Sequence, residues 1–588
     1  MQKFKIKPGL VIIATILFLG CNNGFMERYP LDSISNETFW NSENDLIVYN
    51  NSLYNLMKDD NKVPILIGHG TYDIGRWFLD EFSDNYGSTE PRHNYYHAVR
   101  SGKHNIPSSP EFYGYKGWDF VRACNVGLEN YNNADIGQST IDKYAGEARL
   151  FRGLFYADKV SKFGDVPWIE KELNIDSEEL YAERTPREEA MEKVLADLNF
   201  ACEKLPADWG DGNAPGRLNR WAALHEKSRV CLFEGTWRKY HGGTNANMWL
   251  QEAADAAKEL IEDGPYKLYV TGDIKNDYNA SHRSNDLSGN PEIIHWRKYE
   301  MGVITNQAMG YFGYTGGATK SMVEDYLCTD GLPITLSPLY QGDEVYEDIF
   351  ENRDPRLRQT ILHPNDQSYY NYDGSSAYSY PRVLGMIGGI STNTGYHVIK
   401  NYEYSRISKA YNTEETPALI LRLGEALLNY AEAKAELGTI IQADLDMSIN
   451  KLRDRVGMPH MDLNNIPVDP RYVNNGVSPL IIEIRRERRV ELFLEGFRYD
   501  DLRRWKQGKK LEIPVLGMRW DDAARARFDP ENKALVKTRT ISGIEYIDVY
   551  LGTDWANPVF DESKHYLWPI PISDLSRNPN IGQNPGWN

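Results

Sequence analysis

The sequence predicts a mainly α-helical fold, in which tetratricopeptide-like helix pairs form a scaffold beside an irregular, loop-rich part with short β pieces. Segments with apolar residues at helical spacing recur in two blocks, approximately residues 43–264 and 417–505. Between them, residues 265–416 are rich in Gly, Asn, Ser, Tyr and Pro and have no long amphipathic run. One helix pair cannot bury its own apolar stripe, so neighbouring pairs must share a core. We therefore expect residues 43–588 to form a single domain.

The first twenty residues have the pattern of a bacterial signal peptide. A basic segment, residues 1–7, precedes the apolar run Leu10–Leu19 and then Gly20 and Cys21. The run is about half the ~20 residues that a membrane-spanning helix needs. Residues 21–42 are polar and irregular, which predicts a tether that leads into the fold.

The segment that ends at Cys21, Leu-Phe-Leu-Gly-Cys, resembles the lipobox of bacterial lipoproteins. The resemblance implies that Cys21 is acylated and becomes the mature N-terminus. Several acyl chains would hold the protein firmly in a membrane, since each buried methylene contributes ~0.8 kcal/mol. The alternative is an ordinary cysteine that follows a cleaved signal peptide.

In the first block, the apolar spacing predicts a series of helices in chain order. Thr185 and Pro186, followed by two glutamates, predict an N-cap and a first helical turn for one of them, which runs to Leu205. The other predicted helices cover residues 44–57, 118–131, 141–163, 220–240 and 249–261.

The middle of the chain and the second block differ in their patterns. In the middle, short β-leaning pieces such as residues 292–296 alternate with turn residues, and we expect variable ligand loops there. Helical spacing then returns, and the predicted helices cover residues 417–437, 443–456 and 480–495.

Composition limits the partners. The formal net charge is −18 at pH 7, which argues against nucleic acid and other polyanions. The chain holds 38 Tyr and 14 Trp, and such flat amphipathic rings suit sugar faces and peptide side chains alike. We expect most of these rings in the core and a handful at a binding surface.

The cysteines that follow Cys21 have no spacing typical of a metal or redox site. We expect them to be small buried hydrophobes, although an oxidising compartment would also allow a disulfide whose partners the sequence does not choose. They are Cys124, Cys202, Cys231 and Cys328.

Several segments together resemble the SusD/RagB family of outer-membrane nutrient-capture lipoproteins. The most specific is Ile484–Trp505, an Arg/Glu-rich helix that ends in Glu-Gly-Phe-Arg and continues into Asp-Leu-Arg-Arg-Trp. The C-terminal segments with Pro569-Ile570-Pro571, Asn578-Pro579-Asn580 and Gln583-Asn584-Pro585-Gly586 match the family's terminal signature. Shorter matches cover residues 147–167, 352–356 and 423–433.

Charged clusters within these segments need a separate interpretation. Charges at helical spacing usually form a solvated face, with pairs worth ~0.3 to 0.5 kcal/mol each. Apolar residues accompany the charges of 484–498, so we expect arginines to reach partly buried carboxylates such as Glu491 and Glu495. Arg353-Asp354-Pro355 is likewise interpreted as a turn held by an ion pair. We predict structural networks at both places and no catalytic residue.

Motifs for catalysis are missing from the sequence. There is no His-Glu-x-x-His, no Gly-x-Ser-x-Gly and no P-loop. His93 and His97 have i,i+4 spacing in a segment that is not convincingly helical. A carboxylate pair for glycoside hydrolysis stays an alternative, because such pairs come from distant loops. We expect a protein that is not an enzyme.

A possible cation site lies between two predicted helices. Asp208, Asp211 and Asn213 have oxygen ligands at calcium-like spacing, but Asn219 stands where an EF-hand has its bidentate glutamate. We predict a turn here and no cofactor or metal site, with a structural calcium ion as the alternative.

The resemblance implies a function at the cell surface. Proteins of this family sit as lids over a TonB-dependent transporter of the SusC type and deliver an oligosaccharide, or in some members a peptide, to its barrel. We therefore expect a non-catalytic, lipid-anchored glycan-binding protein in the outer membrane, facing the cell exterior. The alternatives are a surface glycoside hydrolase and a peptide-binding or adaptor protein.

The ligand residues of such proteins lie on variable loops, so we chose candidates by position and chemistry. Rings are expected to stack on sugar faces, and carboxylates, amides and arginines to bind hydroxyls. For each ring, packing in the core is the alternative. The first set is Trp77, Asp84, Asn85, Arg92, Tyr95 and Tyr96, and the second is Trp296, Tyr311 and Tyr314.

Overall fold

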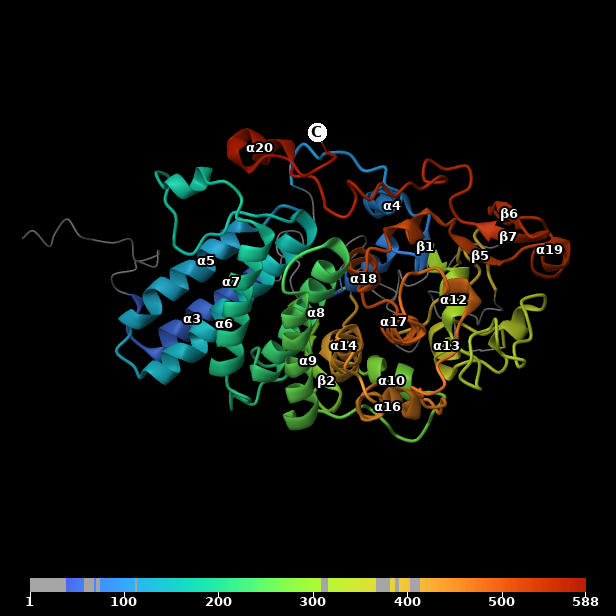
Figure 1. Ribbon diagram of the computed structural model, residues 1–588, viewed down its shortest axis with the longest axis horizontal. Helices are drawn as coiled ribbons and strands as arrows, with labels where there is room; N and C mark the ends of the chain where they lie inside the picture. The colour runs from blue at the N-terminus through green and yellow to red at the C-terminus, as the bar shows by residue number, and fades with distance from the viewer. Residues whose placement is uncertain are drawn as a thin grey trace, which may run out of the picture.

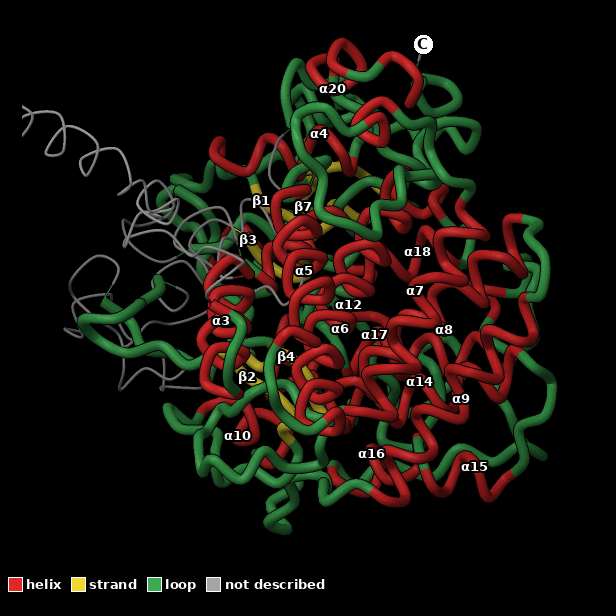
Figure 2. Tube along the Cα trace, turned by 90° about the vertical axis from the view of Figure 1, so that its left-hand side faces the viewer, coloured by secondary structure: helices red, strands yellow, loops and turns green. Residues whose placement is uncertain are grey.

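The computed structural model describes most of the chain from residue 39 onwards. Cys21, the signal peptide, Tyr311 and Tyr314 lie outside the described residues. The described ranges are 39–57, 68–69, 75–110, 114–307, 316–365, 381–385, 391–401 and 413–587. Helices dominate them, and the strands are short (Figure 2).

The first helical block agrees with its prediction. Its long helices stand side by side on one side of the molecule (Figure 1), and α6 packs against α7 as α8 packs against α9. The prediction of helix pairs is confirmed, and α6 begins three residues earlier than predicted. The helices are α3 (Glu43–Met57), α5 (Trp118–Asn130), α6 (Gln138–Phe163), α7 (Arg187–Lys204), α8 (Arg220–His241) and α9 (Ala246–Asp263).

The start of α7 differs from the prediction. The N-cap is Pro186 and not Thr185. The backbone of Thr185 is instead bonded to Val166 in an isolated antiparallel bridge, and this pairing holds it in an extended conformation. The Oδ1 atom of Asp165 accepts the backbone N–H of Arg187 at 2.7 Å. A carboxylate distant in sequence therefore satisfies one backbone N–H of the first turn.

The predicted tether is shorter than 21–42, because the fold includes residues 39–42. Trp40 is buried, and its ring centroid lies 4.7 Å from that of Tyr49 and 5.7 Å from that of Tyr131. The packed domain therefore includes Trp40, just before α3.

The predicted helix over residues 417–437 is in fact a strand followed by a helix. Strand β4 (Ala418–Arg422) pairs antiparallel with β2 (Ile293–Arg297), and α14 (Leu423–Glu436) begins directly after it. All five residues of β4 are buried. A short continuous apolar run is compatible with either element, and pairing with β2 decides for the strand.

The other elements of the second block begin and end at turns that the periodicity does not reveal. The predicted helix 443–456 is divided at Ser448, and α17 ends at Glu491, before the predicted end at Glu495. Gly496 has φ +79° and no room for a side chain, since a Cβ would lie 2.7 Å from the carbonyl oxygen of Arg76. The helices are α15 (Gln442–Met447), α16 (Ile449–Arg455), α17 (Pro479–Glu491) and α18 (Arg498–Arg504).

The remaining elements are short. Most of them lie on the side of α8, α9 and α14 that is away from α3, α5, α6 and α7 (Figure 1). Strand β1 (Tyr86–Ser88) pairs with β3 (Gly316–Ala318), and β7 (Ile544–Asp548) lies between β5 (Leu516–Arg519) and β6 (Thr538–Ile541). The short helices are α4 (Asn94–Arg100), α10 (Asp277–Arg283), α12 (Lys320–Asp325), α13 (Pro355–Thr360), α19 (Asp522–Phe528) and α20 (Ile572–Arg577).

The charged helix α17 is buried, as predicted for a structural network. Glu491 accepts hydrogen bonds from Arg455 at 2.6 Å, Arg422 at 2.8 Å and Arg356 at 2.9 Å. Glu495 pairs with Arg422 at 2.7 Å. The burial of both glutamates against arginines confirms the expectation for this helix.

The neighbouring Arg353–Pro355 turn has an ion pair at Asp354, as predicted, but its cation is Arg356. Asp354 pairs with Arg356 at 2.7 Å and caps α13, so the ion pair is not with Arg353. The guanidinium of Arg353 instead donates to backbone carbonyls of Val323, Ile349 and Tyr326. These carbonyls belong to the segments around α12 and the turn before α13.

The described cysteines are all free. Cys124, Cys231 and Cys328 are buried and Cys202 is half-buried, as expected for small hydrophobes.

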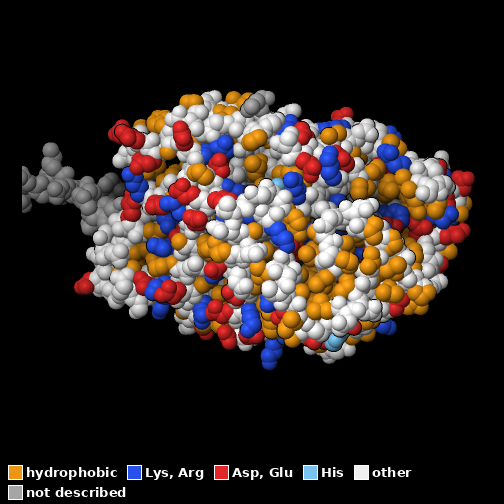
Figure 3. All heavy atoms as spheres, in the orientation of Figure 1, with side chains coloured by type: hydrophobic (Ala, Val, Ile, Leu, Met, Phe, Trp, Pro, Cys, Tyr) orange, Lys and Arg blue, Asp and Glu red, His pale blue; other side chains and the backbone are white. Residues whose placement is uncertain are grey.

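No described helix has the length and apolar character of a membrane span. On the face drawn in Figure 3, side chains of both charges mix with apolar patches.

Candidate ligand-binding cavities

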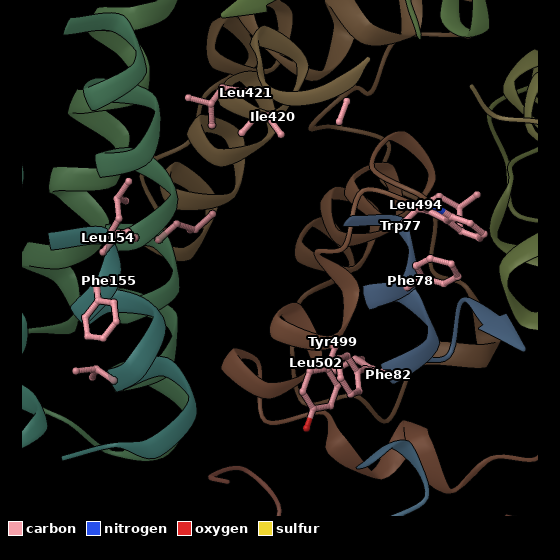
Figure 4. Close-up of a cluster of buried hydrophobic side chains, with 14 of the residues drawn as sticks. Trp77, Phe78, Phe82, Leu154, Phe155, Ile420, Leu421, Leu494, Tyr499 and Leu502 are labelled. Atoms are coloured by element: carbon pink, nitrogen blue, oxygen red, sulfur yellow. The ribbon is translucent and has the colours of Figure 1, made fainter. Parts of the chain in front are cut away.

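Two rings of the first predicted set are core side chains. Trp77 is 2% exposed and stacks on Phe78, with 4.1 Å between ring centroids. Figure 4 shows Trp77 beside Leu494. Tyr96 in α4 is completely buried, and its ring lies 4.7 Å from that of Phe82. Neither ring presents a face to a ligand in this structure, so a stacking role would need a movement that exposes it.

Two polar residues of the first set, Asp84 and Asn85, bind arginines of α17 and α18. Asp84 accepts from Nε of Arg498 at 2.7 Å, and its carboxylate lies 3.3 Å from Arg489. Burial opposes the charged form of Asp84, but Arg489 and Arg498 hold its pKa well below the usual range. Asn85 accepts from Nε of Arg489 at 2.8 Å. Asp84 and Asn85 are thus brought together, as structural partners of two arginines.

Arg92 and Tyr95 lie nearer the surface. Nε of Arg92 donates to Glu90 at 2.9 Å. Tyr95 is half-buried and lines a cavity of about 500 Å³ together with Trp555 and Trp568. Of the two predicted stacking platforms in α4, Tyr95 is therefore the one with a cavity beside it.

Trp296 from the second set lies in β2 and lines a different and larger cavity. This cavity has a volume of about 880 Å³. Trp296 is only 4% exposed, so protein atoms cover most of its ring. The predicted residues are therefore not brought together in one site, because Tyr95 and Trp296 line separate cavities.

The larger cavity, which we call the β2 cavity, is built from segments far apart in sequence. Its lining comes from one face along the length of α3, the start of α6, the turn before α8, β2 with the residues after it, and β4. The lining includes the aromatic residues Tyr54, Tyr144, Trp209 and Trp296 and the side chain of Arg217. A cavity of this size is in the range of ~300 to 1,000 Å³ that suits small-molecule ligands.

Three rings surround one guanidinium in the wall of the β2 cavity. The Cζ atom of Arg217 lies 5.2 Å from the ring centroid of Trp209, 5.4 Å from that of Tyr54 and 5.7 Å from that of Tyr144. Arg217 also donates to both oxygens of Glu147, at 2.9 and 2.5 Å. This bidentate pair holds the guanidinium in one orientation and fixes the rings around it.

Hydrogen bonds lock the same rings from behind. The Nε1 atom of Trp209 donates to the carbonyl of Leu218 at 2.9 Å, and the hydroxyl of Tyr54 donates to Glu147 at 2.6 Å. The hydroxyl of Tyr144 donates to Glu43 at 2.9 Å. Because the polar ends are held by protein groups, the ring faces are oriented in advance. Trp209 and Tyr54 are half-buried, which leaves part of their surface open.

Polar groups complete the lining. Asn51 and Asn213 are exposed and line the cavity with Lys143 and Glu300. The Oδ1 atom of Asn51 accepts from Arg217 at 2.7 Å. Flat rings beside amides, cations and carboxylates can bind a ligand that has both apolar faces and hydroxyl or amide groups.

Sequence reasoning missed Tyr54, Tyr144, Trp209 and Arg217 as a group. Tyr54 and Tyr144 lie in helices, where a ring at helical spacing is normally core. Trp209 was a detectable signal, because it stands in a turn with Asp208 and Gly210, where a large ring has little core to fill.

The turn at 208–213 forms as predicted. The Oδ1 atom of Asp208 accepts the N–H of Gly210 at 2.9 Å, and that of Asp211 accepts the N–H of Asn213 at 3.0 Å. Asn219 caps α8 by accepting the N–H of Ala222. Within the described ranges, no group of three or more His, Cys, Asp or Glu side chains is arranged to hold a metal ion. A calcium ion at the turn stays an untested alternative.

The segment with His93 and His97 is helical, contrary to the sequence interpretation. His97 lies in α4 and His93 is its N-cap residue. The two rings contact the buried carboxylate of Glu81, at 2.9 Å from His93 and 3.5 Å from His97. The short helix is stabilised by burial against Glu81 and Phe78, which local sequence does not reveal.

The chain is similar to known protein families and to individual proteins. Residues 274–587 match the profile of the SusD family, and residues 84–232 match a second profile described as "Starch-binding associating with outer membrane". This description places the second profile's family at the outer membrane. The chain is 23% identical to SusD-like protein P2 of Formosa agariphila, over 100% of both chains. It is 22% identical to a SusD-like protein of Bacteroides ovatus, over 99% of this chain and 98% of the other.

Solved structures have the same fold. A SusD-like protein from Bacteroides fragilis aligns with a TM-score of 0.70 and 25% identity, over 95% of this chain and 100% of that one. A laminarin-binding SusD-like protein aligns with a TM-score of 0.59 and 19% identity, over 93% of this chain and 100% of that one. The SusD profile covers more than half of the chain, and its match includes α17 and the C-terminal segments. The chain therefore belongs to the SusD family.

Proposed function

We propose that this protein binds an oligosaccharide in the β2 cavity and delivers it, without cleaving it, to a TonB-dependent transporter of the SusC type. The observation that carries the proposal is the arrangement of Tyr54, Tyr144 and Trp209 around Arg217 in the wall of that cavity. Family membership and the carbohydrate ligand named for one structural relative support it.

The wall suits a sugar for physical reasons. A pyranose has apolar C–H faces that pack on rings and a rim of hydroxyls that need hydrogen-bond partners. Trp209 and Tyr54 supply partly open rings, and Asn51 and Asn213 supply exposed amides. Because hydrogen bonds already hold the rings, little conformational entropy is lost when the ligand binds.

Binding without catalysis is supported by two of the three carboxylates that line the cavity, Asp211 and Glu43. A glycosidase needs a general acid whose pKa is raised. The pKa of Asp211 is lowered, chiefly because its carboxylate accepts the backbone N–H of Asn213. Glu43 accepts the hydroxyl of Tyr144. These environments favour carboxylates that position rings and bind hydroxyls.

The anchor is part of the same proposal. A lipid on Cys21 with a polar tether would keep the protein beside a transporter without fixing its orientation. Labelling with a radioactive fatty acid tests it: the wild type should be labelled and found in the outer membrane, and a Cys21→Ser variant should lose both. Full labelling of the variant would refute acylation at this residue.

A binding and product assay tests the function. The full chain, purified in detergent, is titrated with a panel of polysaccharides and their oligosaccharides by calorimetry, and the mixtures are analysed by chromatography. We expect binding of one glycan class and no released sugar. Released sugar would establish the glycoside hydrolase instead.

Copurification from the outer membrane tests delivery. A large β-barrel protein should copurify with the lipidated chain. A different stable protein partner, together with no glycan binding, would favour the adaptor alternative.

A further inference from the structure

A third cavity lies between the first helical block and the C-terminal half. Its volume is about 210 Å³, and we call it the inter-block cavity. Leu154 in α6 lines one side, and Phe82 and Tyr499 line the other. Figure 4 shows these side chains on facing elements. Asp500 also lines it and has a side chain that is 47% exposed, so the cavity reaches the surface there.

The charges in the lining of the inter-block cavity are paired with one exception. Seven Lys and Arg residues line it. Six of them form an ion pair with a carboxylate: Lys162, Arg187, Arg229, Arg488, Arg503 and Arg504. The seventh is Arg76, for which no ion pair is found among the described residues. Within the part of the chain that the structure describes, the lining therefore has one cation without a direct carboxylate partner.

Arg76 is buried despite this lack of a partner. It is 8% exposed, and its Nε atom is enclosed with no hydrogen-bond partner among the described residues. Its Cζ lies 4.9 Å from the ring centroid of Phe497. Burial and the positive charge of Arg229 together lower the pKa of Arg76 to about 10, although the carboxylates of Glu495, Glu425 and Glu226 act in the opposite direction. The guanidinium is still charged at neutral pH.

Arg229 packs on the same ring as Arg76, but its guanidinium has carboxylate partners. Its Cζ lies 5.1 Å from the ring of Phe497, on which Arg76 also packs. Arg229 donates to both oxygens of Glu425, at 2.7 and 2.6 Å, and to Glu226 at 2.7 Å. A buried guanidinium beside Phe497 thus takes carboxylate partners where the chain offers them, and an unpaired buried charge is unfavourable.

We propose that the inter-block cavity binds a small organic monocarboxylate, whose carboxylate pairs with Arg76 and whose carbon body lies against Leu79 and Leu154. A carboxylate matches the planar fork of a guanidinium. A single negative charge matches Arg76, the one cation of the described lining without an ion pair, and a doubly charged phosphate would also face the carboxylates of Glu226 and Glu495. At ~30 Å³ per water, the volume holds about seven waters or one acid of a few carbons.

Calorimetry with the full chain and sodium butyrate, at constant ionic strength, tests the proposal. We expect butyrate to bind the wild type, an Arg76→Met variant to bind it at least tenfold more weakly, and phosphate to bind more weakly than butyrate. Lys258→Met, which removes an exposed cation of α9, is the matched control and should bind butyrate like the wild type.

A crystal of the wild-type protein soaked in butyrate provides an arm that needs no variant. Density for a carboxylate within hydrogen-bond distance of Arg76 is the expected result. Waters alone at Arg76 in the soaked crystal, or equal butyrate affinity of the wild type and Arg76→Met, would overturn the proposal. Tighter binding of phosphate would overturn the assignment of a monocarboxylate.

Discussion

The network around α17 and the wall of the β2 cavity use the same chemistry in opposite ways. In both, guanidinium groups pair with buried carboxylates beside aromatic rings. Glu491 is completely buried, and three arginines occupy its oxygens. In the cavity wall, Glu147 holds Arg217, but two of the three rings around it, Trp209 and Tyr54, keep open surface, while Tyr144 is 3% exposed.

This difference shows that residue type alone does not distinguish a structural site from a binding site. Arginine, glutamate and tyrosine stabilise the fold where every donor and acceptor has a protein partner and no face is open. The same residues can serve a ligand where their polar ends are fixed and their ring faces are open. Exposure of the ring faces is therefore the feature to test.

The largest effect is expected from a substitution that disrupts the network around α17. Glu491→Ala would leave Arg356, Arg422 and Arg455 without their shared carboxylate. Removing one partner of a buried ion network costs ~3 to 5 kcal/mol, so we expect that loss in the free energy of unfolding measured with denaturant. Lys258→Ala, at an exposed ion pair of α9, should change it by less than ~0.5 kcal/mol. Equal small effects would show that the network is not what stabilises this half.

Acid should weaken the same network. Burial would raise the pKa of Glu432, but Arg504 and its neighbours lower it from 4.5 to about 2. The stability that Glu432 contributes is present above pH 4.5 and is lost as pH falls towards 2. Between pH 5 and pH 3, the wild type should therefore lose ~2 kcal/mol more unfolding free energy than Glu432→Gln. Parallel curves for the two proteins would contradict the lowered pKa.

A smaller effect is expected on the cavity side. Trp209→Ala removes a partly open ring from the wall of the β2 cavity, so affinity for the glycan found in the screen should fall about tenfold, or ~1.4 kcal/mol. The circular dichroism spectrum should stay unchanged, because Trp209 lies in a turn. Calorimetry measures the affinity, and an unchanged value would remove the β2 cavity as the site.

The smallest effect is expected at the other cavity. Tyr95→Ala changes the 500 Å³ cavity beside α4 and leaves the β2 cavity intact. We expect glycan affinity within about twofold of the wild type in the same titration, a difference of ~0.4 kcal/mol. A large loss with Tyr95→Ala and none with Trp209→Ala would exchange the roles of the two cavities.

Much of the fold could be predicted, because the regular spacing of apolar residues reveals long helices. The helices of the first block and the buried role of α17 followed from apolar and charged patterns. The strand β4 could not be predicted, since its apolar run fits a helix equally well until β2 lies beside it. The turn after Glu491 depends on the close approach of Gly496 to Arg76, a contact between residues 420 positions apart.

The sequence by itself determined the helical blocks, the Arg/Glu network and the resemblance to the SusD/RagB family, because each depends on spacing or on a contiguous motif. Only the tertiary structure decided which rings are open. Trp77 and Tyr96 belong to an aromatic, polar stretch that resembles a binding loop, yet the 3₁₀ helix Arg76–Phe82 and the helix α4 turn them into the core. Trp209 and Tyr54 meet at Arg217 because three distant segments converge there. Helical spacing indicates which residues share a face, but packing against other segments decides whether that face is covered.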